Sequence, residues 1–108
     1  MGDVMKIAIL TLGLALTLAG QSSAQSYNCQ QSGLNTTERT ICSYADLGYQ
    51  DNEMARLWGL LSNNDRKSMR AGQRQWLKER NWCGSDYSCI YNTYQARIDY
   101  FLETLDGG

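Results

Sequence analysis

Four cysteines that follow an apolar N-terminal segment constrain this chain more than any other feature. They are Cys29, Cys42, Cys83 and Cys89. Thiols in a small exported domain become oxidised, and disulfides persist in a periplasm or outside the cell. The sequence therefore predicts a small domain that is exported and then cross-linked by two disulfides.

Residues 1–24 are typical of a secretory signal peptide. Lys6 precedes the apolar run Ile7 to Gly20, and Ser22-Ser23-Ala24 offers small residues to a signal peptidase. The run is shorter than the about 20 residues that span a membrane. Cleavage is expected after Ala24, with Gly20 and Ser26 as alternative positions, and translation starts at either Met1 or Met5.

The end of the apolar run also bears on membrane attachment. Leu18-Ala19-Gly20 is similar to the end of a bacterial lipoprotein signal, in which the next residue is a lipid-bearing cysteine. Gln21 occupies that position here. Residues 25–108 are therefore expected to form one domain, periplasmic or secreted, with no stable membrane anchor.

Absent residue types exclude much chemistry. The chain has no histidine, which removes Ser-His-Asp and Cys-His catalysis and histidine-containing metal sites. The cysteine spacings, C-x12-C and C-x5-C, fit a four-thiolate zinc site poorly, and there is no phosphate-binding loop. The sequence therefore predicts no enzyme, no metal and no cofactor.

The charge distribution bears on partners. The net charge is −1, and we find no basic stripe or acidic block. Nothing favours nucleic acid or a charged membrane. A protein partner is the expectation that remains, and the oligomeric state is left open.

Capping signals and apolar periodicity predict an all-α fold, because the chain has no proline and little two-residue alternation. Gly84 is placed to end the third helix. Helices are expected from the capping box Asn35-Thr36-Thr37-Glu38 to about Cys42, from the cap Ser43-Tyr44-Ala45-Asp46 to about Leu61, from Ser62-Asn63-Asn64-Asp65 to about Trp82, and from about Tyr87 to Leu105. Short connections imply antiparallel neighbours, and thus a small disulfide-stapled bundle of three to four helices.

Four cysteines allow three pairings, and the predicted helix ends favour one of them. Cys83 ends one helix and Cys89 lies in the first turn of the next, while the lead-in carrying Cys29 can fold back along the helix that ends at Cys42. We therefore expect Cys29–Cys42 and Cys83–Cys89. Loop entropy gives about 3 kcal/mol of stabilisation for the first pair and about 2.4 kcal/mol for the second.

Several segments carry a family resemblance. The cysteines, Thr37 to Cys42, Gln73 to Gly84 and Tyr94 to Ile98 are similar to the LprI-like lysozyme-inhibitor family, over nearly all of residues 25–108. The resemblance implies an all-helical, disulfide-bonded periplasmic or secreted domain. For a mycobacterial lipoprotein member it also implies inhibition of lysozyme. Gln50 departs from the family pattern, which usually has an apolar residue there.

Residue roles follow from spacing and chemistry. Trp76 has a core spacing, and Arg80, one turn later, is expected to form an internal ion pair with Asp51. Candidates for contact with a partner gather around the second disulfide, because tyrosine and tryptophan are favoured anchors at interfaces. They are Trp82, Asp86, Tyr87 and Tyr91.

Two functions remain open. The first is an exported protein-binding module that inhibits lysozyme, a peptidoglycan-cleaving glycosidase. The alternative is a periplasmic structural, accessory or effector-neutralising protein with no effect on lysozyme.

Overall fold

The structure, a computed structural model, describes residues 27–107, and within this range it contains four helices and no strand. The helices are α2 (Thr36–Ser43), α3 (Ala45–Leu60), α4 (Asn63–Trp82) and α5 (Tyr87–Gly107). The predicted all-α fold is confirmed. None of these helices is long and apolar enough to cross a membrane. The expected signal peptide, residues 1–24, lies outside the described residues.

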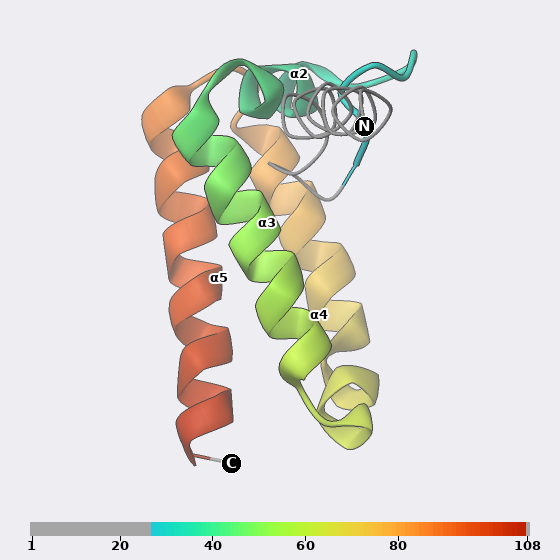
Figure 1. Ribbon diagram of the computed structural model, residues 1–108, viewed down its shortest axis with the longest axis vertical. Helices are drawn as coiled ribbons and strands as arrows, with labels where there is room; N and C mark the ends of the chain where they lie inside the picture. The colour runs from blue at the N-terminus through green and yellow to red at the C-terminus, as the bar shows by residue number, and fades with distance from the viewer. Residues whose placement is uncertain (1–26, 108) are drawn as a thin grey trace, which may run out of the picture.

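The three long helices form a bundle that α2 crosses at one end (Figure 1). Short connections make α4 antiparallel to α3 and α5, as expected. The most extensive packing, however, joins α3 to α5, which run side by side in the same direction. Helix α2 contacts all three long helices, and α4 packs mainly against α2 and α5.

Helix starts follow local capping chemistry with one exception. The capping box of α2 is formed, with the Asn35 side chain accepting from Glu38 N and the Glu38 carboxylate accepting from Asn35 N. The Ser62 hydroxyl caps α4 by accepting from Asp65 N at 3.0 Å. The predicted cap at Ser43 is wrong, because its hydroxyl donates to the Arg39 carbonyl inside α2 and α3 begins without a side-chain cap.

Both predicted disulfides are present. Cys29–Cys42 joins the lead-in to α2 with a Cα–Cα separation of 5.9 Å, and Cys83–Cys89 closes the α4–α5 bend at 5.5 Å. Gly84 follows α4 with φ of +58°, the left-handed conformation expected of a residue just past a helix end. The Cys29–Cys42 pair therefore fastens the lead-in to α2, and the Cys83–Cys89 pair braces the bend between α4 and α5.

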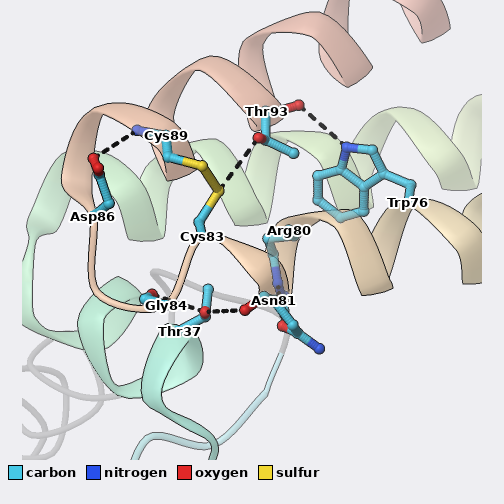
Figure 2. Close-up of a disulfide and its surroundings, with 9 residues drawn as sticks. All are labelled: Thr37, Trp76, Arg80, Asn81, Cys83, Gly84, Asp86, Cys89 and Thr93. Atoms are coloured by element: carbon cyan, nitrogen blue, oxygen red, sulfur yellow. Dashed lines mark hydrogen bonds between the residues drawn. A yellow bond between two sulfur atoms is a disulfide. The ribbon is translucent and has the colours of Figure 1, made fainter.

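One hydroxyl on α2 fixes the α4–α5 bend from outside. The Thr37 hydroxyl lies 2.8 Å from the Gly84 carbonyl oxygen and 3.2 Å from that of Asn81 (Figure 2). Thr37 is buried, and the Asn81 carbonyl also accepts from Gly84 N at 3.2 Å. The Thr37 contact thus attaches the end of α4 to α2.

The core lies where the four helices meet, and each helix contributes buried apolar residues to it. Trp76 is buried as expected, and its indole Nε1 donates to the Thr93 carbonyl at 3.2 Å. The buried apolar cluster consists of Ile41, Leu47, Met54, Leu57, Leu61, Met69, Trp76, Cys83, Ile90, Tyr94, Ile98 and Phe101. Trp58 and Leu105 are only partly buried against it.

Candidate functional site

A charged network is buried where α3, α4 and α5 meet. Asp51 is 1% exposed and Arg80 is 3% exposed. The Tyr94 hydroxyl donates to Asp51 Oδ1 at 2.6 Å and accepts from Arg80 Nη1 at 3.1 Å. Arg80 Nη2 also lies 3.5 Å from a Glu38 carboxylate oxygen. The structure therefore places Tyr94, to which the sequence analysis assigned no hydrogen-bonding role, between the two residues expected to pair.

The protonation states of Tyr94 and Arg80 do not change near neutral pH, because the pKa values of both groups are raised. Burial, and then the charge of Asp51, raise the pKa of the Tyr94 phenol. Burial alone would lower the pKa of Arg80, but Tyr94 and its neighbours raise it, and the net pKa lies above its usual range. Between residues 27 and 107, no group of three or more potential metal ligands comes together. The network is suited to holding helices in register.

A groove of about 350 Å³ opens between α3 and α4 beside this network. Met54 and Trp58 of α3 form its apolar side. Arg70, Arg74 and Leu77 of α4 lie opposite them. The groove thus combines apolar surface with two guanidinium groups.

Three of the four predicted partner-contact residues lie together on α5 or just before it. Tyr87 and Tyr91 stack with their ring centroids 6.1 Å apart, and Tyr44 meets Tyr87 edge-on at 5.0 Å. A hydrogen bond to Asp46 raises the pKa of Tyr87 to about 12. Asp86 caps α5, because its carboxylate accepts from Cys89 N at 3.0 Å (Figure 2).

Trp82 takes no part in the ring contacts of this tyrosine cluster. It is 89% exposed at the last residue of α4, and no described ring packs against it. It borders an open hollow of about 680 Å³ on α4, together with Gln75, Lys78, Glu79 and Asn81. Among the four predicted contact residues, the ring contacts therefore join Tyr87 and Tyr91 and leave out Trp82.

A row of cations on α4 was missed by the sequence reasoning. Lys67, Arg70, Arg74 and Lys78 are all exposed, and their spacings of three, four and four residues place them on one helical face. We call these four residues the basic ridge. The expectation that the chain has no basic stripe is wrong, because the overall charge of −1 conceals a helix with six basic and two acidic residues.

The sequence profile of the family described as "Lysozyme inhibitor LprI" matches residues 27–100. The chain belongs to this LprI family. The matched segment holds all four cysteines, the buried Asp51–Tyr94–Arg80 network and the basic ridge, so an LprI domain accounts for most of the described structure. No curated protein and no solved structure matches the chain.

Proposed function

We propose that this protein is an exported binding module that inhibits lysozyme. The observation that carries the proposal is its membership of the LprI lysozyme-inhibitor family over residues 27–100. The protein partner is then the enzyme itself, and the module acts by occupying a surface rather than by catalysing a reaction. Export by residues 1–24 and an extracytoplasmic location are parts of the same proposal, and two disulfides are consistent with them.

The fold has the rigidity that an inhibitor needs. Ordering loops and side chains on association costs free energy, and a pre-organised surface avoids part of that cost. The Cys83–Cys89 disulfide and the Thr37 hydroxyl hold the end of α4 from two sides. Trp82 projects from that end with most of its surface free, and tryptophan is among the residues enriched at the centres of binding energy.

The chemistry of the target suggests how such a module blocks it. Glycosidases of this kind place a pair of carboxyl groups on either side of the scissile bond, one of them protonated in the resting enzyme. A protein that fills the saccharide cleft excludes the polymer, and cations on that protein can pair with carboxylates there. Inhibition would then be competitive with cell-wall substrate.

A lysis assay with the purified mature protein, residues 25–108, tests the function. Lysozymes of several structural types are incubated with the protein before bacterial cells are added, and complex formation is measured separately by calorimetry. We expect protection from lysis together with a stoichiometric complex. The matched control is the same protein after reduction and alkylation, which should lose both effects. If the oxidised protein gives neither protection nor a complex at micromolar excess, it is an accessory protein with another partner.

Mass spectrometry of the protein recovered from the exporting cell tests the compartment. The expected mass corresponds to cleavage after Ala24 and to the loss of four hydrogens by formation of the two disulfides. An intact N-terminus with free thiols would contradict export.

A further inference from the structure

The basic ridge continues along α4 into Trp82. Trp82 follows Lys78 by four residues, so that it lies on the same exposed helical face. From Lys67 to Trp82 the row is about 22 Å long at the rise of an α-helix. The row lies on one exposed face of α4 and ends in an exposed aromatic ring.

The ridge cations serve no interaction inside the described structure. Between residues 27 and 107, none of the four has an ion pair or a hydrogen bond from its side chain. The other five basic residues in that range all have one: Arg39, Arg56, Arg66, Arg80 and Arg97. Like charges one turn apart destabilise a helix, so folding does not account for this row.

The ridge also concentrates the charge of the molecule on one helix. The sequence of α4 carries a net charge of +4, from six basic and two acidic residues, in a chain whose net charge is −1. The remaining segments are therefore acidic in sum. A field that is positive on one edge orients the molecule as it approaches an anionic surface and accelerates association.

We propose that the basic ridge and Trp82 form the inhibitory surface and enter the carboxylate-bearing cleft of lysozyme. This inference rests on the proposed function and names the surface that performs it. The two ridge guanidiniums, Arg70 and Arg74, pair with carboxylates of the cleft, because the planar guanidinium matches a carboxylate through two parallel hydrogen bonds. Trp82 anchors the end of the ridge at the rim of the cleft.

The shape of the ridge, like its charge, suits the saccharide cleft of lysozyme. A cleft that binds a polysaccharide is long and narrow, and a helix with its side chains is about 10 to 12 Å wide. The ridge presents one exposed face of such a helix, and within residues 27–107 its four cations make no ion pair or hydrogen bond. Among the described residues, no cation lies over a ring of the Tyr44, Tyr87 and Tyr91 cluster, and Tyr87 donates to Asp46, so this cluster is less suited to carboxylates.

Single substitutions with a charge-matched control test the proposal. Arg74→Glu and Trp82→Ala should each raise the inhibition constant by about 30-fold or more. Arg56→Glu changes the net charge by the same amount as Arg74→Glu, but Arg56 lies on α3 and pairs with Glu53. The Arg56→Glu substitution should raise the inhibition constant by less than about 3-fold, which is the change expected from a weaker overall electrostatic field. Helical circular dichroism and thermal unfolding confirm that each variant is folded.

The outcomes separate this inference from the function on which it rests. If the wild type inhibits lysozyme and both variants, Arg74→Glu and Trp82→Ala, inhibit as well as the wild type, the proposal for the basic ridge is overturned while the proposed function stands. Equal weakening by Arg74→Glu and Arg56→Glu would also overturn it, since only the general field would matter. If the protein protects cells but forms no complex with the enzyme by calorimetry, the ridge binds an anionic cell-wall polymer instead. If the wild type neither protects nor binds, both proposals fail together.

Discussion

The Tyr94 hydroxyl donates a 2.6 Å hydrogen bond to the buried Asp51 carboxylate and so ties α5 to α3. The same oxygen accepts a hydrogen bond from Arg80 of α4 at 3.1 Å. One phenol oxygen thereby links the three long helices in the region where they converge (Figure 1). The relative positions of these helices determine where the α4 face points, so this contact connects the core to the proposed inhibitory surface.

Removal of that hydroxyl should weaken the fold. Tyr94→Phe keeps the ring and leaves a buried carboxylate and a buried guanidinium each without one partner. We expect a loss of about 1 to 3 kcal/mol in the free energy of unfolding, measured with urea. Tyr100→Phe is the matched control, because Tyr100 is 44% exposed and should change stability by less than about 0.5 kcal/mol. Equal losses in the two variants would contradict the role of the Tyr94 hydroxyl.

The protein should lose stability in alkaline solution. The folded-state pKa of Tyr94 is raised, chiefly by burial, and that of Tyr27 is raised in the same way. An unfolded tyrosine titrates near about pH 10, so the stabilisation is fully present below that pH and is lost as the pH rises toward the folded value. The decline should approach about 1.4 kcal/mol per pH unit for each such group. Urea unfolding between about pH 8 and about pH 11 measures it, and Tyr94→Phe should show a shallower decline.

Asp51 and Arg80 should be energetically coupled through Tyr94. We expect a double-mutant cycle of Asp51→Asn and Arg80→Gln to give an interaction energy of about 0.5 to 3 kcal/mol. A second cycle, of Asp51→Asn with Lys67→Gln, is the control, because Lys67 lies about 20 Å along α4 from Arg80. That pair should be additive. A coupling of zero for Asp51 and Arg80 would remove the proposed internal ion pair.

The helices and disulfides could be predicted because their signals are local. A capping box such as Asn35 with Glu38, or a cysteine on each side of a tight bend, acts over a few residues and does not depend on the rest of the fold. The cap at Ser43 was wrongly predicted because its hydroxyl has a competing acceptor in the preceding turn, the Arg39 carbonyl. Tyr44, not Ser43, is the N-cap residue of α3, and its side chain makes no capping hydrogen bond.

The functional surfaces were harder to predict because they depend on which helices meet. Asp51 and Arg80 were expected to pair directly, whereas the position of Tyr94 between them follows from the parallel packing of α3 and α5. The basic ridge was visible in the spacing of α4, yet whole-chain charge hid it. Trp82 was singled out, but the ring contacts that join Tyr87 to Tyr44 and Tyr91 could only come from the structure.

Gly84 should be sensitive to substitution although a side chain there would point into open space. Its φ is +58°, and a Cβ at this position would meet no atom within 4 Å, so the cost of Gly84→Ala comes from the backbone alone. We expect a loss of about 1 to 2 kcal/mol in the free energy of unfolding. Gly59→Ala is the matched control, because Gly59 also has open space but lies inside α3. That substitution should stabilise the protein by up to about 1 kcal/mol. Changes of the same sign would contradict the left-handed helix end.

The Cys83–Cys89 disulfide should matter more for inhibition than for folding. Replacing Cys83 and Cys89 with alanine should lower the free energy of unfolding by about 2.4 kcal/mol. The corresponding loss for the Cys29–Cys42 pair is about 3 kcal/mol, because that disulfide closes a longer loop. Loss of the Cys83–Cys89 pair frees the end of α4 beside Trp82, whereas loss of the Cys29–Cys42 pair frees the lead-in to α2. Inhibition constants measured where both variants are folded should therefore rise clearly for the Cys83–Cys89 variant only. If the two variants inhibit equally well, the rigidity of the α4–α5 bend does not contribute to binding.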